Sequence, residues 1–128
     1  MRLNPDCVRD ILLTVEEITD FNTYWNFSKY NILDDRLKKY SPEEFIYHVH
    51  QCYKANLIDD CRFYDAGETG VIGDLTPYGH QFLSNIREDA NWNKTKEIAK
   101  SIGSNSLDVL KDIASSVISA LIQSTLNL

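Results

Sequence analysis

Three histidines and three cysteines are the side chains of this 128-residue chain best suited to hold a metal ion. His48 and Cys52 are four residues apart, which would place both on one face of a helix, whereas His50 points elsewhere. Neither Cys-x-x-Cys nor His-x-x-x-His, the spacings of common zinc sites, occurs in the chain. We therefore expect no metal and no cofactor, and ordinary core or surface roles for these residues.

Nucleophilic catalysis needs a serine or cysteine beside a base that a third group orients. The sequence contains no nucleophile elbow and no paired-carboxylate motif. Its glycine-rich segment, residues 67–73, lacks the Lys-Ser/Thr ending of a phosphate-binding loop. The cysteine count is odd and the first ten residues hold no apolar signal segment, which is typical of a reduced, cytoplasmic protein. We expect a cytoplasmic protein that is not an enzyme.

Two strong helix-start signals mark elements that would position these side chains. An Asn-Pro pair at 4–5 can cap a helix, and apolar residues then recur at helical spacing, which predicts a helix over 5–19. A Ser-Pro pair at 41–42, followed by two glutamates, gives the same signal for a helix that ends near residue 56. Both helices are expected to bury one apolar stripe.

Extended structure is predicted in the middle of the chain. Aromatic residues within 24–30 favour a short strand, and residues 32–37 favour one or two helical turns. Two strand-like runs, 58–64 and 71–75, flank a loop at 65–70 that holds two glycines and an aspartate. This composition between two apolar runs predicts a β-hairpin.

The rest of the chain is predicted to be helical. A Thr-Pro pair at 76–77 begins a helix over 77–90. Further helices are expected over 92–102, ended by Gly103 as the C-cap, and over 105–126. The expected fold class is mainly α with a small β-hairpin.

Residues 5–90 resemble a winged helix-turn-helix. The segment 41–58, from Ser-Pro-Glu-Glu to Asn-Leu-Ile, resembles a recognition helix that continues into the first strand of the wing. The segment 75–83, Leu-Thr-Pro-Tyr-Gly-His-Gln-Phe-Leu, resembles the second wing strand as it enters the next helix. The resemblance implies a winged-helix-like domain over 1–90 and a C-terminal helical extension over 91–128, which serves for packing or dimerisation.

A closer resemblance covers nearly the whole chain. It is carried by Asn-Pro-Asp-Cys-Val-Arg-Asp-Ile-Leu at 4–12, Tyr-His-Val at 47–49, Leu-Thr-Pro-x-Gly-His at 75–80 and Trp-x-Lys-Thr-Lys-Glu-Ile-Ala at 92–99. With these motifs the chain resembles an uncharacterised family of small bacterial proteins, many encoded in phages and prophages, that carries a domain-of-unknown-function label. The resemblance implies a phage context and transfers no catalytic or binding residue.

Charge disfavours nucleic acid as the partner. The formal net charge is −6, and residues 41–90 alone hold three basic and nine acidic side chains. Because phosphate contacts supply most of the affinity for DNA, a face that meets DNA must be positive. We therefore predict that the winged-helix-like surface binds a host or phage protein; the alternative is a dimeric winged-helix transcriptional regulator that binds DNA. The candidate partner or DNA surface comprises Glu43, Glu44, Tyr47, His48, Gln51, Lys54 and Arg62.

The C-terminal segment carries no charged side chain from residue 113 to residue 128. Sixteen residues are fewer than the about 20 that a membrane span needs, and serines interrupt the apolar run, so we expect no membrane role. Apolar residues at alternating spacings of three and four predict a stripe that packs on the rest of the chain or pairs with its copy in a homodimer. The stripe consists of Leu107, Leu110, Ala114, Val117 and Leu121.

Overall fold

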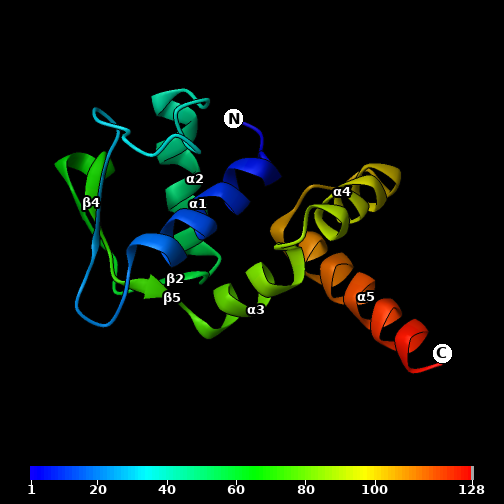
Figure 1. Ribbon diagram of the computed structural model, residues 1–128. Helices are drawn as coiled ribbons and strands as arrows, with labels where there is room; N and C mark the ends of the chain where they lie inside the picture. Colours follow the sequence, from blue (N-terminus) through cyan, green and yellow to red (C-terminus); the bar gives the residue numbers. More distant parts are fainter. Residues whose placement is uncertain (128) are drawn as a thin grey trace. The chain divides into compact units, whose positions relative to one another are not determined.

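The computed structural model describes residues 1–127, which form five α-helices, five short β-strands and one 3-10 turn (Figure 1). The prediction of a mainly helical protein with a small β part is confirmed. The chain divides into two units, Met1–His80 and a second that begins at Gln81, so the division falls within helix α3 (Pro77–Ile86). The sequence had suggested residue 90 as the end of the first part.

Two capped helices form the core of the first unit. In α1 (Pro5–Ile18) the Asn4 side chain accepts a hydrogen bond from the Asp6 N–H, and in α2 (Pro42–Lys54) Ser41 accepts one from the Glu44 N–H at 3.1 Å. Both predicted helix starts are therefore confirmed. The two helices pack on each other (Figure 1). Their buried apolar residues are Cys7, Val8, Ile11, Leu12 and Val15 in α1, and Phe45, Val49 and Cys52 in α2.

The β part of the first unit consists of two small antiparallel sheets. Strands β1 (Trp25–Ser28), β3 (Arg62–Tyr64) and β4 (Thr69–Ile72) form a three-stranded sheet in the order β1-β4-β3. Strands β2 (Ile58–Asp59) and β5 (Asp74–Leu75) pair beside it. The predicted hairpin and the predicted short strand near residue 25 are both present.

Each arm of the hairpin is interrupted once, which the sequence did not reveal. Asp60 takes a left-handed conformation at φ 52°, which aspartate tolerates better than most residues. Opposite it, the Gly73 N–H donates to the Asp59 carbonyl at 3.1 Å, and the Asp60 side chain lies against the Gly73 backbone. A Cβ at residue 73 would lie 2.7 Å from the Cβ of Asp60, so this close approach requires glycine.

Residues 34–40 form hydrogen-bonded turns, and the helical turns predicted over 32–37 do not develop into a regular helix. The Asp34 carboxylate accepts the Arg36 N–H at 2.8 Å, a local bond that competes with helix formation. The turns end at Tyr40, whose hydroxyl donates to the buried Asp10 carboxylate at 2.5 Å. Burial is the main cause that raises the pKa of Tyr40, and this hydrogen bond to Asp10 raises it further.

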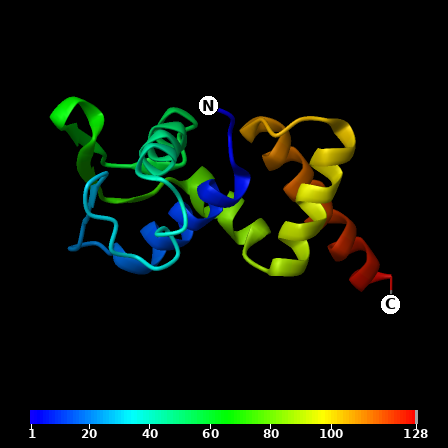
Figure 2. The ribbon, with the colours of Figure 1, turned by 90° about the horizontal axis from the view of Figure 1, so that it is seen from above.

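The second unit contains an α-helical hairpin, α4 (Asp89–Ile102) and α5 (Leu107–Leu126), whose helices run antiparallel (Figure 2). Gly103 ends α4 at φ 84°, as predicted for its C-cap. Helix α3 ends at Ile86 and not at the predicted residue 90, because Glu88 is extended and α4 restarts with Asp89 in its first turn. The buried apolar residues of α4 and α5 are Trp92, Ala99, Leu110, Ile113 and Ala114.

Candidate interaction surface

The outward side of α2 is the best candidate site in the first unit. Glu43, Tyr47, Gln51 and Lys54 recur at spacings of three and four and are exposed or half-buried. They lie opposite the residues of the same helix that enter the core. We call these four residues the α2 face. The structure thus brings together four of the seven residues that the sequence proposed for a partner surface.

His48 is not part of this surface, which corrects the sequence-based prediction. Its side chain is 0% exposed, and its two ring nitrogens each lie 2.7 Å from a backbone atom: Nε2 from the Asn4 N and Nδ1 from the Glu44 carbonyl oxygen. Because the Asn4 N–H must donate, Nε2 is the acceptor and Nδ1 carries the proton that it donates to Glu44. His48 therefore joins the beginning of α1 to α2 and is unavailable to a partner.

Glu44 takes part in the same joint between the two helices. Its carboxylate accepts a hydrogen bond from the Asn4 side-chain amide at 3.3 Å, and the residue is half-buried. Its backbone N–H is the one that Ser41 caps. Glu44 and His48 are therefore best explained as structural residues that hold the N-terminal cap of α1.

The hairpin packs on α2 through an aromatic cluster. This cluster was not predicted from the sequence. The Phe63 ring of β3 stacks on His50 with centroids 4.3 Å apart and meets Tyr53 edge-on at 5.2 Å. His50 Nε2 also lies 2.7 Å from the Gly67 carbonyl oxygen. His50 and Tyr53 are three residues apart on the flank of α2, and this helical spacing was the only signal of the cluster in the sequence.

Arg62 points away from α2, so the structure separates it from the other candidates. Side chains alternate along a strand, and Phe63 faces α2; Arg62 therefore lies on the opposite face of the sheet. There it is close to Tyr24 and Asp60. A hydrogen bond to the Asp60 carboxylate raises the pKa of Tyr24, and the Arg62 guanidinium opposes that shift. The sequence could not reveal this separation because it depends on which strand face meets α2.

Negative charge is concentrated in the first unit. Residues 1–80 hold eight basic and fourteen acidic side chains, a formal charge of −6, whereas residues 81–128 hold five of each. Lys54 is the one basic residue of α2. Near the α2 face, Lys29 bridges two carboxylates, with Nζ 3.7 Å from Glu43 and 3.8 Å from Glu68. The α2 face therefore offers phosphate no cationic strip.

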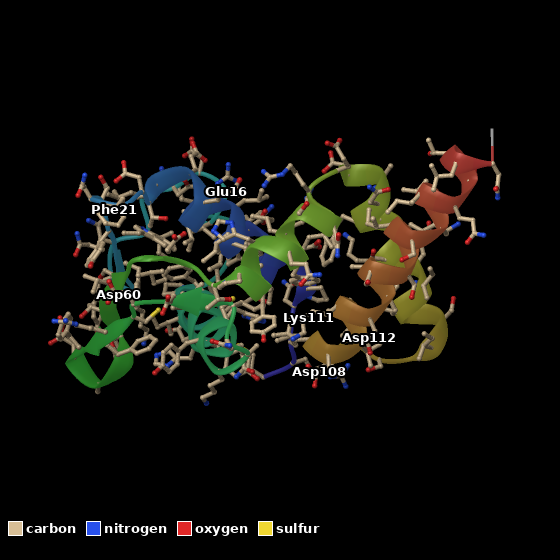
Figure 3. The ribbon with its side chains drawn as sticks, turned by 90° about the horizontal axis from the view of Figure 1, so that it is seen from below. Glu16, Phe21, Asp60, Asp108, Lys111 and Asp112 are labelled. Carbon is tan, nitrogen blue, oxygen red and sulfur yellow. The ribbon has the colours of Figure 1, made fainter. Side chains whose placement is uncertain are left out.

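Aromatic side chains are exposed around the same unit. Phe21 is 97% exposed in the segment between α1 and β1, and Figure 3 shows it at the edge of the first unit. Five tyrosines of this unit expose about half of their surface or more. They are Tyr24, Tyr30, Tyr53, Tyr64 and Tyr78. Tyrosine is enriched at protein–protein interfaces because it combines a large apolar area with a polar hydroxyl.

The thiols are poorly suited to nucleophilic chemistry. Burial, aided by the Glu44 and Asp10 carboxylates, raises the pKa of Cys7 to about 12. Burial also raises the pKa of Cys52, and burial with the carboxylates of Asp59 and Asp60 raises that of Cys61 to about 12. These thiols stay protonated near neutral pH, and the thiolate is the reactive form. Within residues 1–127, no three His, Cys, Asp or Glu side chains gather in a way that could hold a metal ion.

The predicted dimer stripe on α5 is divided by the structure. Leu110 and Ala114 are fully buried, so they are unavailable to a second copy. Leu107 and Val117 are half-buried, and Leu121 is 47% exposed. Only the C-terminal end of the stripe is therefore open. Within the described part of the chain, α5 is the one helix whose length and composition would allow it to cross a membrane.

These features define a small, mainly helical protein with an acidic, tyrosine-bearing first unit and a helical hairpin. The chain belongs to the family described as Hypothetical protein (DUF2513), whose model matches residues 2–105. It is also 30% identical over 124 residues to an uncharacterized protein of Haemophilus influenzae, covering 95% of this chain and 99% of that protein. The resemblance to an uncharacterised family is thereby confirmed. No solved structure matches the chain.

Proposed function

We propose that the first unit is a non-catalytic, winged-helix-like module that binds a basic protein surface through the α2 face. The order α1, β1, α2 and then a hairpin supports the winged-helix assignment. The sheet order β1-β4-β3 supports it as well, since the hairpin strand that follows the wing turn lies between the other two. Fold alone does not fix function, so the chemistry of the α2 face must identify the ligand.

The observation that carries the proposal is the charge of this surface. In a winged-helix DNA reader the α2 face would enter the major groove, where it needs several cations to contact phosphates. Here it opens with Glu43 and holds one lysine, within a unit of formal charge −6. A basic protein surface would be attracted to the same face, and Tyr47 supplies an aromatic anchor at its centre.

The proposed setting is the cytoplasm of a bacterium that carries a phage or prophage. It follows from the resemblance of segments such as residues 4–12 to phage-encoded proteins, and from the three unpaired cysteines. The partner in this setting would be a host or phage protein. The raised pKa values of Cys7 and Cys61 support a non-catalytic role.

The alternative is a winged-helix regulator that binds DNA, and the order of elements favours it as much as it favours the module. It requires Lys54 and Arg62 to meet phosphate together. Arg62 lies on the sheet face turned away from α2, beside Asp60. One protein cation cannot supply the affinity of a typical specific site, which neutralises several phosphates.

The test compares two variants of the full chain as baits in a host lysate, with and without nuclease. Tyr47→Ala removes the anchor of the α2 face, and Tyr78→Ala is the matched control, a tyrosine exposed on α3. We expect proteins that are retained after nuclease treatment, lost with Tyr47→Ala and kept with Tyr78→Ala. In parallel, a labelled random-sequence duplex is titrated at about 50 mM salt. Tight duplex binding that weakens with Lys54→Glu would replace the proposal with the DNA-binding alternative.

A further inference from the structure

An apolar groove runs between α4 and α5 in the second unit. It encloses about 680 Å³. One wall is the face of α4 that carries Lys94, Ile98 and Ile102 at intervals of four residues, and the other wall includes Val117 and Leu121 of α5. Ile102 is 61% exposed although it is a large apolar residue. An apolar surface that is gathered in a groove, and not scattered, is typical of a binding site.

The C-terminal half of α5 has no covering element within the described residues of the second unit. Helix α5 has 20 residues and α4 has 14, and every residue from 119 to 127 is exposed. Leu121, Ile122 and Leu126 lie in this part, and Leu126 is 79% exposed. The charged residues of α5 are confined to its first half, as Figure 3 shows for Asp108, Lys111 and Asp112.

We propose that the groove is filled in solution by the C-terminal half of α5 from a second copy of this chain, and reciprocally, so that the second units form a symmetric dimer. This inference uses residues 81–127 alone. It is therefore independent of the function proposed for the α2 face, and either can fail without the other.

The uncovered part of α5 is short enough to fit within the length of the groove. The α4 wall extends from residue 90 to residue 102, which is about 20 Å at 1.5 Å per residue. The uncovered part of α5, from residue 119 to residue 127, has nine residues and is about 13 Å long. One segment can therefore occupy about two thirds of the groove's length.

The chemistry also fits a copy of the same chain. The entering segment carries no charge, so its burial against the apolar groove walls desolvates no ion. Residues 81–128 have a formal charge of zero, so two copies do not repel each other through this unit. By contrast, association through the first unit would bring two charges of −6 together.

Symmetry follows from the position of Val117 and Leu121. These residues line the groove and also belong to the segment that would enter the partner's groove. A two-fold axis beside them pairs the two α5 helices antiparallel, with one α4 on either side. The product is a four-helix bundle, which closes the core that a two-helix hairpin leaves open.

A lipid surface is a poorer occupant than a second copy. The polar side of the segment carries serines at 115, 116, 119 and 124 and Gln123, and these side chains are uncharged. The segment also lacks the basic residues that would hold it at anionic headgroups.

The first test measures the mass of the full chain by sedimentation over a range of concentrations. We expect a dimer for the natural chain. Leu121→Asp places a carboxylate in the groove and in the entering segment, and should raise the dissociation constant at least about tenfold. Ser115→Asp adds the same charge at an exposed position outside the groove and should leave the dimer intact. Circular dichroism verifies that both variants keep their helices.

A second test does not depend on the folding of a charged variant. Ala120→Cys places a thiol in the groove lining, close to the expected axis, and should crosslink two copies on mild oxidation. Ser115→Cys is the control and should not. A chain that is monomeric at all concentrations overturns the proposal, as does a dimer that Leu121→Asp leaves unchanged. Flotation of a monomeric chain with anionic vesicles would overturn it in favour of a lipid surface.

Discussion

The two units of this protein differ in where their charge and their exposed apolar surface lie. The first unit has the whole formal charge of −6 and exposes mainly tyrosines, while its aliphatic residues are largely in the core. The second unit is neutral and leaves Ile102, Leu121, Ile122 and Leu126 open to solvent. An acidic surface selects a partner of opposite charge, whereas a neutral apolar groove suits a copy of itself. On this difference rest our two proposals, that the first unit binds a partner protein and that the second unit associates with its own copy.

The largest predicted effect tests whether the first unit is held by its own core. Phe45→Ala deletes a buried ring that contacts Trp25, with centroids 6.1 Å apart, and should lower the free energy of unfolding by about 3–5 kcal/mol. Phe21→Ala removes a ring that is almost fully exposed and should change it by less than about 0.5 kcal/mol. Urea denaturation followed by circular dichroism measures both. Equal losses of unfolding free energy for the two variants would contradict the burial of Phe45 in the core.

A second prediction separates the buried histidine from the α2 face. His48→Ala leaves the Asn4 N–H without its acceptor inside the protein and should lower the free energy of unfolding by about 2–3 kcal/mol. His80→Ala, at an exposed position on α3, should have little effect. Partner capture by a folded His48→Ala chain should persist, because this side chain does not reach the surface. An unchanged free energy of unfolding would contradict the buried, structural role of His48.

A third prediction compares one glycine from each unit. Gly67 and Gly103 both have left-handed backbones, at φ 87° and 84°. A Cβ at residue 67 would lie 2.9 Å from the His50 ring, whereas a Cβ at residue 103 would meet nothing within 4 Å. Alanine should therefore cost about 1 kcal/mol at residue 103 and about 1–3 kcal/mol at residue 67. Thermal unfolding of the two variants measures the difference, and a larger loss at residue 103 would contradict the contact between His50 and the hairpin.

A fourth effect is expected in alkaline solution. Burial raises the pKa of Cys7 from 9.0 to about 12, so above pH 9 the thiol ionises in the unfolded chain before it does so in the folded one. The unfolded state then binds fewer protons, and the free energy of unfolding falls as pH rises from 9 towards 12. Cys7→Ala should make this decline shallower. Urea titrations between pH 8 and pH 10.5 measure it, and parallel slopes for both chains would exclude the buried thiol as the cause.

Elements whose signals are local were predictable from the sequence. The caps at Asn4 and Ser41, the prolines that follow them and the C-cap at Gly103 act within a few residues of the chain, and the helices begin or end there. The hairpin was predictable for the same reason, from a glycine-bearing turn between two apolar runs. Membership of an uncharacterised family also followed from sequence motifs, and the match of a family model to residues 2–105 confirms that membership.

Tertiary contacts decided which predicted side chains are available to a partner. His48 is buried because the N-terminus of α1, 44 residues away in sequence, supplies its hydrogen-bond donor. Arg62 is turned from the α2 face because Phe63 takes the inner side of β3. On α5, Leu110 is buried and Leu121 is open, although both belong to one periodic stripe. Periodicity identifies an apolar side of a helix, but only the packing of distant segments determines how much of that side is covered.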